Sequence, residues 1–200
     1  MLLKNLNTID EQYLWSRFIE GDNNSYEFLY RKYVTELFSY GMRFTKDREL
    51  IKDCIHDVFV KIYNNRSNLS NIENVKLYLF ISLKNTLFNV FEKDKSLYHV
   101  DTVEPVFSVD YPVEDEWLMD DMEEEKKIRI SKILEGLTPR QKEVMYYRYV
   151  EGFSLQHICE IMDMNYQSVQ NLIQRAIKKL QTVFTEKNKK SLKIRMRFRN

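Results

Sequence analysis

Apolar residues recur at every third or fourth position through most of this chain, a spacing typical of helices with one buried face. In the first half this spacing predicts four helices, over residues 10–20, 25–44, 47–63 and 75–91. A Gly-Asp-Asn-Asn break ends the first, and the Asn- and Ser-rich stretch 64–74 reads as a loop. The first three helices are expected to bury Tyr13, Leu14, Phe18, Ile19, Phe28, Leu29, Tyr33, Leu37, Phe38, Ile51, Ile55, Val58, Phe59 and Ile62.

The pattern breaks at residues 94–116, which hold two of the three prolines, many acidic residues and no apolar period. Such a segment cannot bury enough apolar surface to fold, so a linker is predicted. A helix is predicted again over 117–135, and Gly136 provides its stop. The expected fold is all-α, with two small helical domains joined by an acidic flexible linker.

Residues 138–180 carry the signals of a helix-turn-helix. Thr138 is a predicted N-cap, Pro139 takes the first helical position and Gln141 the third, as in a capping box. Three helices are predicted, over about 138–152, 154–162 and 165–185. The last two helices are expected to point the following apolar residues toward the core: Leu155, Ile158, Ile161, Val169, Leu172, Ile173, Ile177 and Leu180.

The outward face of the last helix is polar and becomes basic toward its end. Gln and Asn side chains can pair with adenine edges in the major groove, Arg can pair with guanine, and Lys178 and Lys179 suit phosphates. A solvated face of a small helical bundle is the alternative, but capping, turn, inward spacing and polar face all favour a DNA-reading helix. The predicted reading residues are Tyr166, Gln167, Gln170, Asn171, Gln174, Arg175 and Lys178.

Charge is distributed very unevenly along the chain, although its net value is only +1. Residues 1–93 carry a net charge of +1, residues 94–125 of −11 and residues 126–200 of +11. A basic module beside an acidic segment suggests a part that binds a polyanion and a part that nucleic acid would repel.

Composition narrows the class of protein further. Only four Gly and three Pro in 200 residues favour long helices over a turn-rich β fold. Cys54 and Cys159 lie far apart inside apolar patterns without a CxxC motif, so we expect buried thiols and no metal site. No signal peptide and no apolar run of about 18 residues is seen, so a cytoplasmic protein is expected.

A second polar face follows the third predicted helix, where Asp53, His56, Asp57 and Lys61 recur at three- and four-residue steps. Catalysis or metal binding would need a nucleophile or a third ligand nearby, and none is offered, so a face that docks another protein is favoured. Farther on, amides and cations among aromatic residues suit single-stranded DNA, although most of those aromatics are expected to be core. These residues are Ser70, Asn71, Ile72, Glu73, Asn74, Lys84, Asn85, Asn89 and Lys93.

With these motifs in order, the chain resembles a bacterial RNA polymerase sigma factor of the sigma-70 family, in the extracytoplasmic-function (ECF) group. The run Asp57-Val58-Phe59-Val60-Lys61, with Tyr78-Leu79-Phe80 and Asn85 after it, resembles the family's region 2. Leu137-Thr138-Pro139-Arg140-Gln141 and Glu151-Gly152-Phe153-Ser154 resemble region 4. The resemblance implies region 2 at 9–93, an acidic linker at 94–116, region 4 at 117–185 and a basic tail at 186–200.

The resemblance also implies roles for the two polar faces. Asp53, His56, Asp57 and Lys61 would dock on the β′ clamp helices of core RNA polymerase, and region 4 would meet the β flap. The loop 70–74 would capture a flipped base of the −10 element, while Lys84, Asn85, Asn89 and Lys93 would line the melted strand. The helix from Asn165 would read the −35 element. Promoter DNA and an anti-sigma factor are the further partners implied.

The resemblance implies no catalytic residue, cofactor or small-molecule substrate, because the polymerase performs the chemistry. The linker would pass near the active-site channel, where its acidic side chains could mimic a nucleic-acid backbone. His56 stands where the family most often has Gln, and Gln167-Ser168 replaces a common Gly-Thr, so no known promoter sequence can be transferred. The competing hypothesis is a free-standing helix-turn-helix regulator with an N-terminal sensor or dimerisation domain.

Overall fold

The computed structural model describes residues 11–69, 72–98, 107–108, 134 and 136–197, with the backbone alone for 94–98 and 183–197. The chain divides into two compact units, residues 1–105 and 106–200. Helices and no strand occur among the described residues, as the sequence predicts. The expected cap at Asp10, most of the predicted 117–135 helix and two predicted site residues, Ser70 and Asn71, lie outside the described part.

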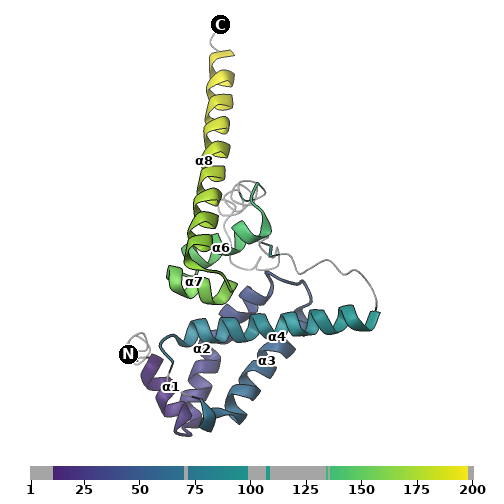
Figure 1. The fold of residues 1–200 in the computed structure, drawn as a ribbon, viewed down its shortest axis with the longest axis vertical. Coiled ribbons are helices and arrows are strands. Elements are labelled where there is room, and N and C mark those ends of the chain that lie inside the picture. Colours follow the sequence, from purple (N-terminus) through teal and green to yellow (C-terminus); the bar gives the residue numbers. More distant parts are fainter. Residues whose placement is uncertain (1–10, 70–71, 99–106, 109–133, 135, 198–200) are drawn as a thin grey trace. The chain divides into compact units, whose positions relative to one another are not determined.

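The described residues of the first unit form four α-helices and a short 3₁₀ turn (Figure 1). They are α1 (Glu11–Ile19), α2 (Asn23–Gly41), α3 (Arg48–Asn64), η2 (Arg66–Asn68) and α4 (Val75–Tyr98). Side-chain caps fix where three of them begin: Asp22 accepts from Asn24 N, Asp47 from Leu50 N, and Asn74 from Leu77 N. α4 extends past the predicted end at 91, so the predicted linker boundary at 94 falls inside a helix.

The core of this unit forms where α2 packs against α1, α3 and α4. The rings of Tyr40 and Phe80 stack with centroids 4.5 Å apart. In α1 the prediction was wrong at one position, since Tyr13 is 59% exposed while Trp15 is 1% exposed. Trp15 lies edge-on to Phe18 and Tyr78. Tyr13 is two residues from Trp15, about 200° around the helix, so it lies on nearly the opposite side, toward solvent.

The second unit has three described helices, α6 (Pro139–Tyr149), α7 (Leu155–Met162) and α8 (Tyr166–Arg197). The predicted capping box is present in both directions between Thr138 and Gln141. Ser154 caps α7 by accepting from His157 N at 3.1 Å. The tight turn into α8 places Asp163 in the left-handed region, with φ 49°.

α8 continues past the predicted end near residue 185 and runs to Arg197 (Figure 1). No Gly or Pro interrupts the stretch from 166 to 197, and Lys, Gln, Arg and Leu are good helix formers, so no local signal stops the helix. The backbone of residues 186–197, predicted as a separate basic tail, is therefore a continuation of this helix.

One residue of the predicted linker contradicts the expectation that this segment buries no apolar surface. Phe107 is only 3% exposed. Its ring centroid lies 5.4 Å from that of Tyr146 and 6.2 Å from that of Tyr147, both on α6. A single aromatic side chain buries enough area to anchor a segment that has no apolar period of its own.

α2 and α3 approach each other closely at Gly41. A Cβ atom at Gly41 would lie 2.6 Å from Cγ2 of Ile51, whose side chain is fully buried. Glycine is therefore required here by packing, since an ordinary helical residue would clash.

We predict that Gly41→Ala lowers the free energy of unfolding by about 1–3 kcal/mol, measured by urea denaturation, because the added methyl overpacks the contact. Alanine normally favours a helix over glycine, so the sign of the effect is informative. In an Ile51→Ala background, which itself costs about 2–5 kcal/mol, the same change should cost nothing. A cost that persists in that background would contradict the steric explanation.

Candidate docking and nucleic-acid interfaces

The outward face of α8 carries all seven predicted reading residues away from the core. Tyr166 is 51% exposed. Gln167, Gln174, Arg175 and Lys178 are exposed, while Gln170 and Asn171 are half-buried. The opposite side is closed by the buried residues Val169, Ile173 and Ala176.

The start of this face is locally ordered. Asn165 caps α8 by accepting from Ser168 N at 2.8 Å. Gln167 donates from Nε2 to Asn171 Oδ1 at 3.2 Å. This hydrogen bond fixes how the two side-chain amides are oriented relative to each other. Amides arranged along the first turns of such a helix present donors and acceptors of the kind that pair with base edges.

The angle between the helices that support α8 is held by contacts that sequence reasoning missed. Arg140 on α6 donates to the carbonyl oxygen of Met162 at 3.4 Å, at the end of α7. Arg148 donates to the carbonyl oxygen of Phe153 at 3.1 Å, across the turn between α6 and α7. Each of these two hydrogen bonds joins residues that come together only when the turn is folded. The spacing of residues in the sequence could therefore not reveal these hydrogen bonds.

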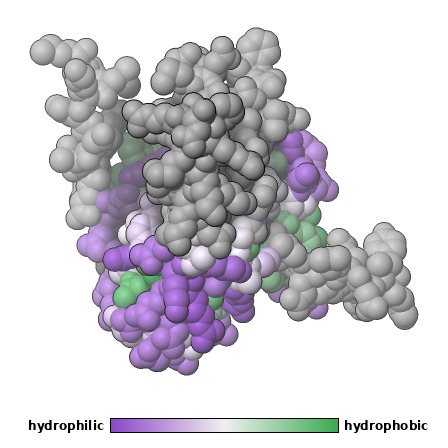
Figure 2. Space-filling model, turned by 90° about the horizontal axis from the view of Figure 1, so that it is seen from above, coloured by the Kyte–Doolittle hydropathy of each residue, from purple (hydrophilic) through white to green (hydrophobic). Residues whose placement is uncertain are grey.

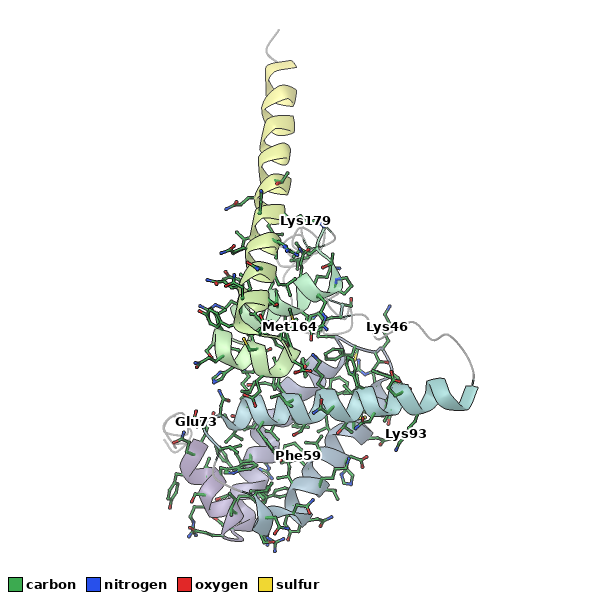
Figure 3. The ribbon with its side chains drawn as sticks, in the orientation of Figure 1. Lys46, Phe59, Glu73, Lys93, Met164 and Lys179 are labelled. Atoms are coloured by element: carbon green, nitrogen blue, oxygen red, sulfur yellow. The ribbon has the colours of Figure 1, made fainter. Side chains whose placement is uncertain are left out.

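The predicted docking face on α3 is continuous and exposed. Asp53, His56, Asp57 and Lys61 are all exposed, and Val60 between them is 37% exposed. The reverse side of the helix is buried through Cys54, Ile55, Val58, Phe59 and Ile62. Figure 3 shows Phe59 inside the first unit. Sequence reasoning missed Val60, whose apolar side chain adds a contact point to a charged face.

Cys54 lies directly behind this face. Burial, with the neighbouring carboxylates of Asp57 and Asp53, raises the pKa of the Cys54 thiol to about 11. The thiol is therefore protonated and unreactive at neutral pH, in agreement with the predicted buried cysteine. Cys159 is half-buried, so the prediction of burial is met only partly there.

The loop before α4 is tied to α1. Gln12 donates from Nε2 to the carbonyl oxygen of Glu73 at 3.1 Å, although 61 positions separate them. Glu73 is exposed, while Ile72 and Asn74 are half-buried. The amide oxygen of Asn74 is engaged in capping α4. Of the described loop residues, Glu73 thus presents its side chain most openly, at one end of α4 in Figure 3.

Three of the four residues predicted on α4 share one exposed row. Asn85, Asn89 and Lys93 are exposed at four-residue intervals. Lys84 is half-buried and lies on a neighbouring face, with Nζ 5.8 Å from the ring centroid of Phe88. Lys93 lies toward the opposite end of α4 from Glu73 (Figure 3).

A pocket of about 240 Å³ opens between α3, the turn after it and α4. Its walls combine apolar side chains with polar groups, and its lining comes from separate elements, so sequence spacing gave no signal for it. The lining residues are Val58, Lys61, Ile62, Asn65, Leu69, Tyr78, Ser82 and Thr86.

The described residues hold no cluster of three or more His, Cys, Asp or Glu side chains able to bind a metal ion. Among the helices described, none has the length and apolar character needed to cross a membrane. Hydrophilic residues make up most of the coloured surface visible in Figure 2, with smaller hydrophobic patches between them.

Comparison with known proteins identifies both halves of the chain. The family described as Sigma-70 region 2 matches residues 29–96, and the family described as Sigma-70, region 4 matches residues 127–180. RNA polymerase sigma factor YlaC of Bacillus subtilis is 24% identical over 155 residues, covering 76% of this chain and 88% of that protein. The ECF RNA polymerase sigma factor SigX of the same organism is 21% identical over 160 residues, covering 78% and 81%.

Two solved structures share the fold. CnrH, solved in complex with the cytosolic domain of CnrY, has a TM-score of 0.57 at 15% identity and covers 88% of this chain and 99% of its own. The sigma factor RpoE of Bartonella quintana, solved with the anti-sigma factor NepR, has a TM-score of 0.54 at 18% identity, covering 78% and 94%. At these identities the likeness establishes a common fold only.

The two matched regions occur in family order and together account for more than half of the chain, so it belongs to the sigma-70 family of RNA polymerase sigma factors. Within that family it is an ECF sigma factor. It is thus a transcription-initiation factor that acts with core RNA polymerase at promoters. The free-standing regulator is not favoured, because such a protein has no use for region 2.

Proposed function

We propose that this sigma factor divides its work among three surfaces. The exposed face of α3, with Asp53, His56, Asp57 and Lys61, docks on the β′ clamp helices of core polymerase. The loop before α4 and the exposed row on α4 capture and hold the −10 element. The outward face of α8 reads the −35 element, while region 4 meets the β flap.

The outward face of α8 is the observation that carries this proposal. Seven polar or amphipathic residues lie on the solvent side of a capped helix whose other side is closed by Val169, Ile173 and Ala176. Helix-turn-helix proteins place the N-terminal part of the second helix in the major groove. Amides and Arg175 there supply the direct reading of bases.

The pocket beside the loop supports the −10 assignment. An enzyme or factor that takes a base out of the stack must offer a site for the unpaired base, with hydrogen bonds to its edge. Asn65 and Ser82 provide polar groups at this pocket, and Tyr78 provides an aromatic ring. Lys61 lines the pocket as well as the docking face, so it stands where polymerase binding and base capture would meet.

Several finer parts of the proposal rest on the family. RpoE was solved in complex with an anti-sigma factor, and CnrH in complex with the cytosolic domain of CnrY. We infer that a similar partner protein covers these surfaces of this chain. The acidic segment within 94–116 would run near the polymerase active-site channel. The protein would act in the cytoplasm, with no cofactor, no small-molecule substrate and no catalytic residue of its own. The boundaries at 9–93, 94–116, 117–185 and 186–200 are proposed on the same grounds.

Run-off transcription with purified core polymerase tests the proposal as a whole. Addition of the protein should yield open complexes at specific start sites, while the protein alone should bind duplex DNA weakly. Tight, specific duplex binding by the isolated protein, without any association with core polymerase, would contradict it.

We predict that Arg175→Ala weakens discrimination at one or two −35 positions by about 1–3 kcal/mol per base pair, because a bidentate contact to a base edge is lost. Core binding should be unchanged. Lys179→Ala is the matched control, since the loss of a phosphate contact weakens binding nearly equally on all sequences. Competition among −35 variants measures both effects, and equal losses for the two substitutions would count against a reading role for Arg175.

We predict the opposite result for Asp57→Ala. Affinity for core polymerase should fall roughly tenfold, the effect of about 1.4 kcal/mol, while promoter selection by saturated holoenzyme stays the same. Glu20→Ala, directly after the end of α1, provides an exposed acidic control outside α3. Titration of labelled protein with core polymerase gives the affinities, and equal effects of the two substitutions would remove α3 from the proposed docking surface.

A further inference from the structure

The buried side of α8 ends well before the helix does. Val169 and Ala176 are buried against the rest of the second unit. Lys187 follows Val169 by 18 residues, which is about five helical turns, so a lysine takes the register position of a buried valine. The helix nevertheless runs to Arg197 and extends well past α6 and α7 in Figure 1. Residues 187–197, which we call the arm, therefore offer this unit no continuous apolar stripe to bury.

The arm is strongly basic, with six Lys and Arg residues and no acidic one. Its register repeats that of the basic residues at the reading face. Lys193 follows Arg175 by 18 residues, and Arg197 follows Lys179 by the same number, about five turns in each case. The backbone of α8 thus places a second basic cluster on the side of the helix that carries the first. The positions of this second cluster are Lys189, Lys190, Lys193 and Arg197.

The two basic clusters are too far apart to share one groove of DNA. Ten residues, about 15 Å of helix, separate Lys179 from Lys189, and Arg197 lies about 12 Å farther along. The major groove of B-DNA is about 12 Å wide. A groove winds around the duplex, whereas α8 continues straight (Figure 1). If its first turns lie in the groove, the second cluster therefore falls outside the groove segment that those turns occupy.

Charge indicates which kind of surface would cover the arm. Positions 189, 193 and 197 are spaced by four residues, where like charges on a helix repel each other. An anionic surface along the arm would relieve this repulsion. Duplex DNA carries one negative charge per about 1.7 Å of its axis. Its phosphates are the anions that α8 approaches when its first turns contact base edges.

We propose that the arm, residues 187–197, binds the DNA backbone beside the −35 element through its phosphates, without reading sequence. The arm adds affinity to region 4, while Arg175 and the amides of the first turns select the bases. It acts as a continuous helix, so its contacts have a fixed position relative to the −35 element. This proposal rests on the proposed function, in which α8 reads the −35 element.

The salt dependence of promoter binding tests the charge of the arm. A variant of the full chain, the Gln variant, combines Lys189→Gln, Lys190→Gln, Lys193→Gln and Arg197→Gln, since Gln is as good a helix former as Lys. Each phosphate contact contributes about −0.9 to the slope of log affinity against log salt, so the slope should become shallower by about 3–4. Between about 50 and 200 mM salt, wild-type holoenzyme should lose roughly 100-fold more promoter affinity than the variant. A slope within about one unit of the wild-type slope would overturn the proposal.

A matched variant keeps every charge of the second cluster. It combines Lys189→Arg, Lys190→Arg, Lys193→Arg and Arg197→Lys in the full chain. Its salt slope should equal that of the wild type, because phosphate contacts depend on charge and carry no sequence information. A slope as shallow as that of the Gln variant would show that charge is not the cause, and the proposal would fail.

A break in the helix tests whether the arm is continuous with the reading helix. Asn188→Pro removes a backbone hydrogen bond and clashes with the preceding turn. Asn188→Ala favours the helix, and neither substitution changes a charge. Hydroxyl-radical footprints of the holoenzyme should show protected backbone beside the −35 element for the wild type and for Asn188→Ala. Asn188→Pro and the Gln variant should lose this protection, and its persistence in either would overturn the proposal.

The same footprints distinguish the arm from the function on which it rests. If wild-type holoenzyme does not protect the −35 element, the proposed function fails. If it does, and all variants protect the same flanking backbone, the function stands and the arm is refuted. Two further measurements use the Gln variant. Loss of affinity for core polymerase, or loss of wild-type binding to phosphatidylserine vesicles, with an unchanged salt slope on DNA would assign the arm to a different partner and overturn the proposal.

Discussion

The constraint on which this structure depends is that each helix must bury one face, so recognition is left to the face that remains. α3 shows this directly: Ile55, Val58 and Phe59 are buried, and the opposite side leaves Asp57 and Lys61 in solvent. α8 repeats the arrangement, with Val169 and Ile173 inside and Arg175 outside. The apolar period that folds the protein therefore also fixes where the residues proposed to bind polymerase and DNA lie.

This coupling explains why much of the fold and site could be predicted from sequence. Helix periodicity and capping are local, so the N-caps at Thr138, Ser154 and Asn165 and the polar face of α8 could be found from neighbouring residues. The outward position of a side chain follows once the inward stripe is known. The assignment of those side chains to −10, −35 or polymerase came from the family and stays a prediction.

What sequence reasoning missed depends on contacts between distant residues. Trp15, rather than Tyr13, is buried because Tyr78 of α4 meets it, a contact that no local period encodes. The pocket beside Asn65 draws its walls from separate elements. Phe107 sits in a segment that composition marks as a linker, yet two tyrosines of α6 receive its ring. Composition describes a segment on average and cannot show a single anchoring side chain.

The central claim is that the two units read two separate promoter elements while bound to one polymerase. Site-specific photocrosslinking tests it most directly, with a photoreactive amino acid at position 73 or 174 of the full chain. In the holoenzyme, position 73 should crosslink to the −10 element and position 174 to the −35 element, with much lower yields in the absence of core polymerase. Crosslinks to the opposite elements, or equal yields without core polymerase, would contradict the account.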